Sequence, residues 1–395
     1  MWPVTLSREY ALPLSIYVHI PWCIHKCPYC DFNSHEFQGQ DIKHNEIIYT
    51  NALIKQLENT NFSSQRSIHS IFFGGGTPSL FSPEAFKNII NKISEKFGLE
   101  DNCEITIEAN PGTVDKQYFY GYKDVGINRM SLGIQSFNEK HLKKLERIHN
   151  KQEACEAAKL AVKLFDKVNI DLMFALPEQT PSELSDDITM ALDIGSSHIS
   201  YYHLTIEPNT YFYKHPPKVP NHDDSSKLFD LVSDGLKNAN FEHYETSAYA
   251  KKGSQCLHNL NYWNFGDYLG IGAGAHSKIT SGGSIRRYAC HKNPKYYLSE
   301  VDKNNFIKEE HRLTNNDLVF EYMMNALRLN NGFDISNFER RTNLPIDEIK
   351  KELLIAKEKQ LISEINGRIK PTILGQNFLN ELLQIFLRDQ NYDVK

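Results

Sequence analysis

The stretch Ser15–Cys30 reads Ser-Ile-Tyr-Val-His-Ile-Pro-Trp-Cys-Ile-His-Lys-Cys-Pro-Tyr-Cys. Its first residues form an apolar, β-branched run that predicts a strand over Ser15–Pro21. Three cysteines follow directly, Cys23, Cys27 and Cys30, with the spacing C-x3-C-x2-C. Thiolates are the soft ligands that iron–sulfur clusters prefer, so three of them on one short loop can bind three irons of a [4Fe-4S] cluster. The fourth iron then remains open to a small chelating ligand.

The cysteine cluster allows three other interpretations. Cys27–Cys30 alone matches a C-x-x-C redox pair, but that motif opens a helix in a much smaller fold and leaves Cys23 unexplained. Zinc could take the thiolates together with His19, His25 or His35, although structural zinc sites usually draw ligand pairs from two loops. Three inert thiols are the last alternative, and their crowding argues against it. Spacing and context together favour the iron–sulfur cluster.

The composition is that of a globular protein, with 395 residues, 40% hydrophobic and 24% charged residues and a net charge of −5. This charge gives no general attraction to nucleic acid or to anionic membranes. The N-terminus lacks the features of a signal peptide, and no stretch approaches the ~20 apolar residues of a membrane span. We therefore expect a cytoplasmic protein without a disulfide framework. Four further cysteines are expected to be small buried hydrophobic residues: Cys103, Cys155, Cys256 and Cys290.

Short apolar runs alternate with amphipathic stretches through the first half of the chain. The expected strands are Ser15–Pro21, Ile68–Phe73, Glu104–Glu108, Arg129–Ser136, Val168–Phe174 and His198–Ile206. Expected helices between them include Asn45–Glu58, Pro83–Phe97, Gln152–Phe165 and Pro181–Ile194. Six βα repeats predict a parallel sheet with right-handed crossovers, either open and doubly wound or closed into a barrel. Both arrangements place ligands at the carboxyl ends of the strands.

The unusual residues of the chain follow that rule, because each group of them ends or follows an expected strand. In chain order these groups are the three cysteines, Gly74–Pro78, Glu108–Pro111, Gln135, Asp171 (within its strand) and Glu207–Thr210. Because the carboxyl ends of parallel strands meet at one edge of a sheet, we expect these groups to form a single site.

A different pattern begins at Thr314, after a less regular region from about 210 to 300. The expected elements are helices Asn316–Leu329, Asp334–Thr342 and Asp347–Gln360, a short hairpin of Leu361–Glu364 and Arg368–Pro371, and a last helix Leu374–Leu387. This order suggests a small winged-helix-like module. Such modules often bind DNA, but the third helix carries both signs of charge, which favours a structural or partner-docking role.

The cysteine spacing on a loop after the first strand resembles the signature of radical SAM enzymes. The wider string Tyr17–Cys23 is similar to that of the oxygen-independent coproporphyrinogen III oxidases and their relatives, and the similarity extends to the C-terminal module. The resemblance implies an α/β fold, a partial (β/α)6 radical SAM barrel with a C-terminal helical, winged-helix-like module. We expect the barrel over residues 1–210, a barrel-completing region over 211–312 and the C-terminal domain over 313–395.

The same resemblance implies a binding site for S-adenosyl-L-methionine beside the cluster. Gly74–Pro78 lacks the pattern of a P-loop or a dinucleotide fingerprint, and by itself it is equally well explained as a tight turn. Glu108 and Asp171 could accept hydrogen bonds from hydroxyl or ammonium groups, and Arg147 could pair with the carboxylate. The resemblance places the following residues on this cofactor: Tyr17, Gly75, Gly76, Thr77, Glu108, Gln135, Arg147 and Asp171.

Smaller features separate two branches of this family. The oxidases that this chain resembles have the spacing C-x3-C-x2-C-x-C and an N-terminal extension. This chain has Phe32 in place of their fourth cysteine and little room before Cys23. His258–Trp263 reads His-Asn-Leu-Asn-Tyr-Trp and resembles a string of related heme chaperones, as do Glu207–Thr210 and Tyr244–Tyr249. These chaperones bind heme and deliver it to hemoproteins such as those of the respiratory chain.

Within that resemblance, His258 is a candidate heme ligand or heme-site residue. Imidazole binds heme iron, and Tyr262 and Trp263 could stack on a flat porphyrin. The alternative is a histidine that only packs the cleft at the strand ends. His276 is a second candidate, whereas His19 is shared by both branches and distinguishes nothing.

Three hypotheses therefore remain. The first is a heme chaperone that carries a [4Fe-4S] cluster and S-adenosylmethionine, lacks oxidase activity and meets its clients peripherally at the inner membrane. The second is an oxygen-independent coproporphyrinogen III oxidase, which decarboxylates two propionates in porphyrin biosynthesis. The third is a structural cluster joined to a nucleic-acid reader, against which the acidic net charge argues. We expect heme and client hemoproteins as partners and no nucleic acid, and the sequence leaves homodimerisation open.

Overall fold

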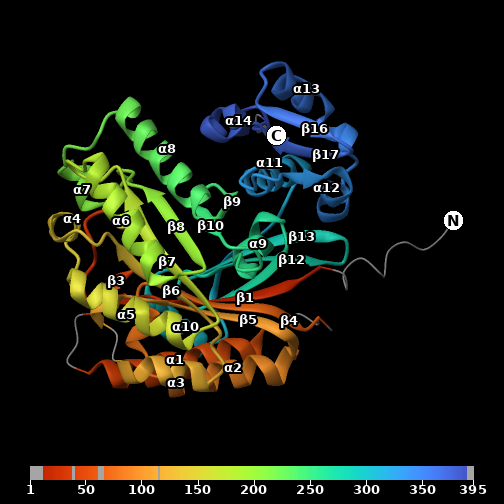
Figure 1. Ribbon diagram of the computed structural model, residues 1–395. Coiled ribbons are helices and arrows are strands. Elements are labelled where there is room, and N and C mark those ends of the chain that lie inside the picture. The colour runs from red at the N-terminus through yellow and green to blue at the C-terminus, as the bar shows by residue number, and fades with distance from the viewer. Residues whose placement is uncertain (1–11, 38–40, 61–65, 114–115, 389–395) are drawn as a thin grey trace.

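The computed structural model describes residues 12–37, 41–60, 66–113 and 116–388 (Figure 1). Six parallel strands form the centre of a twelve-stranded sheet, side by side in chain order. They are β1 (Leu14–Ile20), β4 (Ile68–Gly75), β5 (Leu99–Ala109), β6 (Arg129–Gln135), β7 (Lys167–Phe174) and β8 (His198–His203). An order without reversal is that of a partial barrel, so the expected barrel-type arrangement is confirmed and a doubly wound sheet is not formed.

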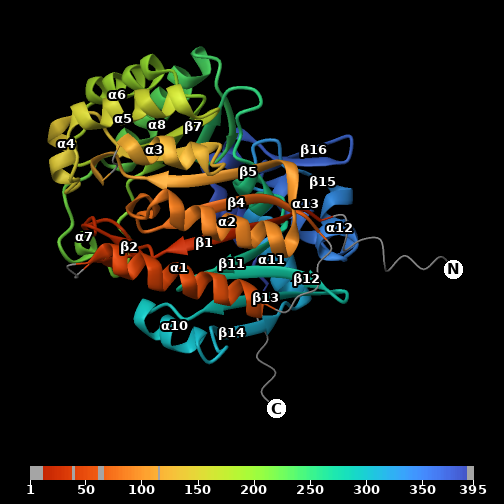
Figure 2. The ribbon, with the colours of Figure 1, turned by 90° about the horizontal axis from the view of Figure 1, so that it is seen from below.

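Right-handed crossovers that all move in one direction place the connecting helices on one face of the sheet. These helices are α1 (Ile42–Asn59), α2 (Pro83–Phe97), α3 (Lys116–Asp124), α4 (Glu139–Lys144), α5 (Lys151–Leu164) and α6 (Pro181–Ile194), with 3-10 turns at Pro78–Leu80 and Pro111–Thr113. Figure 2 shows α1, α2 and α3 lying across this outer face. The opposite face of the central strands is left free of these helices and lines a cavity.

Residues after β8 extend the sheet at both of its edges. One edge gains β11 (Asp267–Ile271), β12 (His276–Ser281), β13 (Ser284–Cys290) and β14 (Ile307–Arg312), and the other gains β10 (Ala248–Ala250) and β9 (Glu242–Glu245). Further elements are β2 (Trp22–Cys23), β3 (His35–Glu36), α7 (Tyr211–Lys214), α8 (His222–Asn238), α9 (Leu257–Trp263) and α10 (Pro294–Val301). β11 runs parallel to β1, so the region after residue 210 continues the sheet of the first half.

Local sequence explains where these elements begin and which way they face. Alternate residues of β1 from Leu14 to Ile20 have no exposed surface and pack in the main core, whereas Tyr17 faces the cavity. α6 begins with a capping box between Thr180 and Glu183 and has proline in its first turn. These signals are local, and accordingly α2 and α6 have the bounds that the sequence predicts.

A buried tyrosine of α1 joins β1 to the loop that follows β11. The Tyr49 hydroxyl donates to the His19 carbonyl over 2.9 Å and accepts from the Ala273 N–H over 2.8 Å. Two turns further along α1, the Gln56 amide oxygen accepts from the Gly272 N–H over 2.9 Å. The two side chains satisfy backbone groups that no strand pairing reaches, and so they hold the seam between β1 and β11.

The C-terminal module has its own small core. It comprises α11 (Asn315–Ala326), β15 (Phe333–Asp334), α12 (Ile335–Thr342), a 3-10 turn (Ile346–Ile349), α13 (Lys350–Glu358), β16 (Ile362–Ile365), β17 (Arg368–Pro371), α14 (Ile373–Asn377) and α15 (Leu379–Gln384). The order of helices and hairpin is as predicted. The expected last helix is broken at Phe378, whose backbone leaves the helical region. This break lets Leu382 and Phe386 enter the module core while Phe378 stays half exposed.

Replacing Tyr49 by phenylalanine tests the seam. The variant keeps the ring but leaves the His19 carbonyl and the Ala273 N–H without their partner, so we expect unfolding to require about 1–3 kcal/mol less free energy. Urea denaturation followed by circular dichroism measures this difference. The matched control is Tyr296→Phe, a half-exposed tyrosine of α10, which should change stability by less than about 0.5 kcal/mol. Equal effects of the two substitutions would contradict the role of Tyr49.

Candidate functional site

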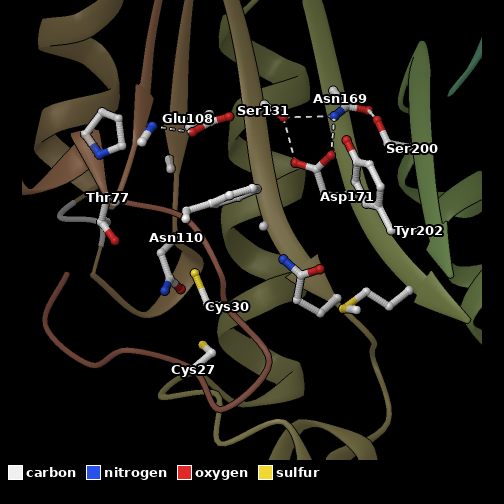
Figure 3. Close-up of a pocket in the computed structure, with 18 of the residues that line it drawn as sticks. Cys27, Cys30, Thr77, Glu108, Asn110, Ser131, Asn169, Asp171, Ser200 and Tyr202 are labelled. Carbon is white, nitrogen blue, oxygen red and sulfur yellow. Dashed lines mark hydrogen bonds between the residues drawn. The ribbon is translucent and has the colours of Figure 1, made fainter. Parts of the chain in front are cut away.

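The loop that carries the three cysteines leaves the sheet at the end of β1 and is tied at its base. β2 pairs with β3 in parallel, and the Phe37 N–H donates to the Cys23 carbonyl over 2.8 Å. Within the loop, the Lys26 ammonium donates to the carbonyls of Phe32 and Ser34 over 3.2 and 3.0 Å. These hydrogen bonds hold the loop in one conformation. Its three cysteine side chains are partly buried and line the cavity (Figure 3 shows Cys27 and Cys30).

The glycine-rich segment after β4 lies directly against the start of this loop. The Gly76 N–H donates to the Ile20 carbonyl over 2.7 Å, and the Thr77 N–H donates to the Trp22 carbonyl over 2.8 Å. A Cβ atom on Gly76 would lie 2.5 Å from the Trp22 carbonyl oxygen. Gly75 has a φ of +116°, a conformation that favours glycine. The tight turn is therefore real, and it aligns the glycine segment with the cysteine loop.

An arginine links the cysteine loop to the end of β6. Arg147 donates from Nη1 to the Cys27 sulfur over 3.2 Å and from Nη2 to the Gly133 carbonyl over 2.7 Å. Its Nε is buried without a hydrogen-bond partner among the described residues. Gln135, at the end of the same strand, has a φ of +70°, which turns its backbone away from the regular strand geometry. Arg147 itself lines the cavity, and among the described residues its Nε has no acceptor.

Two carboxyl groups face the cavity from neighbouring parts of the sheet. Glu108 accepts from the Gly75 N–H over 3.2 Å, and Asp171 accepts from the Ser131 hydroxyl over 2.7 Å and the Asn169 amide over 2.8 Å. Burial and the proximity of Asp171 raise the pKa of Glu108 to about 8. Burial also raises the pKa of Asp171, although its hydrogen bonds oppose this shift. The cavity therefore contains two buried carboxyl groups whose negative charge the protein alone does not fully stabilise.

Deeper in the sheet, a chain of polar side chains continues from Asp171. The side-chain amide oxygen of Asn169 (Oδ1) lies 2.6 Å from His198 Nδ1, and His198 Nε2 lies 2.8 Å from the Tyr244 hydroxyl. Figure 3 shows Ser131, Asn169 and Ser200 grouped around Asp171. This network fixes the orientation of the Asp171 carboxylate. Sequence reasoning did not identify its members, although Asn169 and Asp171 occupy alternate positions of β7 and so face the same side.

α9 covers the inner end of the cavity and carries His258. The carboxylate of Glu104, on β5, accepts from the Leu257 N–H over 2.7 Å and so takes the place of an N-cap residue. His258 is buried, with Nδ1 2.9 Å from the Ser70 hydroxyl and Nε2 3.1 Å from the Tyr262 hydroxyl. Burial lowers the pKa of His258 to about 3. Both ring nitrogens are therefore engaged within the protein, and the ring is neutral.

The cavity has a volume of about 510 Å³. It brings together all of the predicted cysteine and cofactor residues: Tyr17, Cys23, Cys27, Cys30, Gly75, Gly76, Thr77, Glu108, Gln135, Arg147, Asp171 and His258. Two other histidines that the sequence pointed to do not line it. His19 is buried behind the glycine segment, 2.9 Å from the Asn33 carbonyl, and the exposed His276 lies on β12.

The described parts of the chain contain no group of three or more His, Cys, Asp or Glu side chains that converges on one metal ion. The three cysteines thus lie near one another without sharing a single coordination point.

In the same parts of the chain, no helix is long and apolar enough to cross a membrane.

Two family models match separate stretches of the chain. Residues 17–191 match the model of the radical SAM superfamily, and residues 313–378 match that of the HemN C-terminal domain. A solved structure, the radical SAM enzyme coproporphyrinogen III oxidase (HemN) from Escherichia coli, superposes with a TM-score of 0.81 at 22% identity, covering 96% of this chain and 91% of that one. At this identity the likeness establishes the fold, and the expected fold class is confirmed.

Curated relatives match along almost the whole chain. The protein named heme chaperone HemW from Haemophilus influenzae is 46% identical, with 96% of this chain and 99% of that protein covered. The protein of the same name from Escherichia coli is 42% identical over 95% and 99% of the two chains, and that from Bacillus subtilis is 32% identical over 94% and 99%.

The raised pKa of Glu108 leads to a prediction for the protein without added cofactors. A folded-state pKa of about 8, well above the ordinary value of a glutamate side chain, means that the folded state favours the protonated carboxyl group. Ionisation therefore destabilises the wild type as the pH rises from about 5 to 8. Glu108→Gln removes this ionisation, so its stability relative to wild type should increase across that window by about 2–4 kcal/mol.

Urea denaturation of both proteins at pH 5, 7 and 9 measures this difference. The exposed Glu84→Gln in α2 serves as the control and should track the wild type at every pH. Parallel stability curves for wild type and Glu108→Gln would show that Glu108 titrates normally in the folded protein.

Proposed function

Since this chain belongs to the HemW family of heme chaperones, within the radical SAM superfamily, we propose that it binds heme and transfers it to client hemoproteins, with respiratory-chain enzymes among them. The observation that carries the proposal is the match to curated heme chaperones over nearly the full length of both proteins. A chaperone treats heme as cargo, so the proposal requires a reversible heme site and no chemical change to the porphyrin.

We further propose that Cys23, Cys27 and Cys30 hold a [4Fe-4S] cluster. Membership of the radical SAM superfamily implies this cofactor, and the geometry supports it. Each thiolate of such a cluster binds its own iron, so three thiols on a fixed loop need not converge on one point. Arg147, which donates to the Cys27 sulfur, would stabilise a charged thiolate. When bound, such a cluster supplies single electrons to a ligand at its open iron.

The residues around the open side of the loop fit S-adenosylmethionine. The unpartnered Nε of Arg147 offers a donor to a carboxylate, and Glu108 and Asp171 offer acceptors to hydroxyl or ammonium groups. The absence of side chains at Gly75 and Gly76 allows the backbone to approach a ligand closely. We assign this cofactor to Tyr17, Gly75, Gly76, Thr77, Glu108, Gln135, Arg147 and Asp171, all of which line the cavity.

His258 is proposed as a heme-site residue that acts through Tyr262. Because both of its nitrogens are already hydrogen-bonded, direct ligation of iron would require His258 to release Ser70 or Tyr262. The neutral ring instead orients the Tyr262 hydroxyl at the inner end of the cavity. Phe32 supports the chaperone assignment over oxidase activity, because it stands where the oxidases that this chain resembles carry a fourth cysteine, and a phenyl ring offers no thiol.

An anaerobic titration of the reconstituted protein with heme, followed by its Soret band, tests the chaperone function. We expect saturable binding of about one equivalent, and several-fold weaker binding by His258→Ala, because Tyr262 loses its partner. His222→Ala, on the exposed start of α8, is the control. If heme binding is not saturable and the protein converts coproporphyrinogen III, the chaperone function is wrong and the oxidase function is supported.

Iron analysis tests the cluster independently of heme. After anaerobic reconstitution, Cys27→Ser should lose most of the cluster iron and the broad visible absorbance of the wild type, because a hydroxyl is a poor ligand for these irons. Cys155→Ser, on α5 outside the cavity, should retain both. If Cys27→Ser binds as much iron as the wild type, the cysteine loop is not the cluster site.

A further inference from the structure

A second cleft lies where the C-terminal module meets the sheet, and it shares no lining residue with the cysteine cavity. Its volume is about 440 Å³. The walls come from the β12–β13 hairpin, the junction of β14 with α11, and the end of α12 (Figure 1 shows α12 beside this hairpin). The buried aliphatic part of the lining consists of Leu12, Ile285, Leu313, Leu318 and Leu344.

Three arginines line the same cleft, Arg312, Arg340 and Arg341. Arg341 is only 8% exposed, and its Nη1 is buried without a hydrogen-bond partner among the described residues. The amide oxygen of Asn337 accepts from Arg340 over 3.0 Å and from Arg341 over 3.4 Å, which brings two like charges together on a neutral group. A buried cation with a free donor is costly unless an anion approaches it.

Asp267, the buried carboxylate whose charge acts on Arg341, cannot serve as that anion. Asp267 has no exposed surface, and it already accepts from Arg66 over 2.7 Å, from Lys278 over 2.9 Å and from the Thr280 hydroxyl over 2.8 Å. Burial and the adjacent Arg340 lower the pKa of Arg341. The carboxyl end of α12 favours positive charge, but this partial charge provides no acceptor for Nη1.

We propose that this cleft binds a small amphipathic anion, in which a carboxylate or phosphate group meets Arg341 and Arg340 while an apolar body lies along the aliphatic wall. Guanidinium groups recognise such oxyanions through paired N–H donors. The exposed Arg312 stands at the mouth of the cleft, where it attracts the ligand. Two sources share this chemistry, the propionates of heme and a fatty acid or lipid-like acid.

Isothermal titration of the full-length protein at constant ionic strength tests the site with three probes of equal chain length: sodium octanoate, octyl phosphate and 1-octanol. We expect saturable 1:1 binding of at least one of the two anions and at least tenfold weaker binding of the alcohol. Arg341→Gln should weaken anion binding at least tenfold, and Arg312→Gln several-fold. The control is Lys351→Gln, which removes an exposed charge from the same module outside the cleft and should leave binding unchanged.

The proposal is overturned if neither anion binds, if 1-octanol binds as tightly as the anions, or if both arginine variants bind like the wild type. Circular dichroism verifies that each variant is folded, and Arg312→Gln retains the test if Arg341→Gln does not fold. Repeating the titration on protein saturated with heme identifies the source. Loss of binding of the anion that the heme-free protein bound assigns the cleft to the heme propionates, and unchanged binding assigns it to a lipid-like acid. A failure of heme binding itself appears in the Soret titration and leaves the anion test intact.

Discussion

The candidate site depends on one close contact between backbones. The ends of β1 and β4 pair up to Ile20 and Gly75, and the glycine segment then continues against the start of the cysteine loop. The Trp22 carbonyl leaves no space for a side chain at Gly76. Because the Gly75 N–H also binds Glu108, this contact sets the relative position of the cysteines, the glycine segment and the first carboxyl group. Any substitution that separates the two backbones therefore disturbs three parts of the site together.

The inner face of the sheet is unusual because polar side chains occupy strand positions that are normally apolar. Ser131, Asn169 and His198 are buried and satisfy one another and Asp171 through short hydrogen bonds. Burying such groups is costly unless nearly every donor and acceptor is paired. The pairing makes the floor of the cavity rigid, and the carboxyl groups of Glu108 and Asp171 line the cavity above it. The same hydrogen bonds that fix Ser131 and Asn169 also hold the Asp171 carboxylate in place.

The C-terminal module is joined to the sheet by ion pairs as well as by apolar packing: Arg287 on β13 pairs with Glu321 on α11, and Arg328 pairs with Glu245 on β9 over 3.1 Å. Asp267 on β11 lies between Arg66 and Lys278, and Phe265 and Ile285 of the sheet region belong to the module's core. Arg66 and Lys278 lie close enough to Arg341 of α12 for their charges to interact, so the second cleft adjoins a positively charged part of this junction. Both charge interactions and apolar packing therefore hold the module against the sheet.

Much of the fold could be predicted because its signals are local. Caps, prolines and hydrophobic periodicity set the bounds of α2 and α6, and the βα alternation indicated parallel strands. Periodicity could not choose between a doubly wound sheet and a partial barrel, because strand order depends on the direction of each crossover. The break of the last helix at Phe378 was missed for a related reason, since it depends on which side chains the module core accepts.

By itself, the sequence determined the cysteine loop, the glycine segment and the strand ends at which Glu108 and Asp171 lie, because these depend on spacing and on the rule that parallel strands end at one edge. Only the tertiary structure decided that both nitrogens of His258 are engaged, that Glu104 caps α9 and that Arg341 keeps a free donor beside a saturated Asp267. These facts depend on contacts between residues far apart in the chain. No local pattern encodes them, since hydrogen-bond partners are set by packing in space.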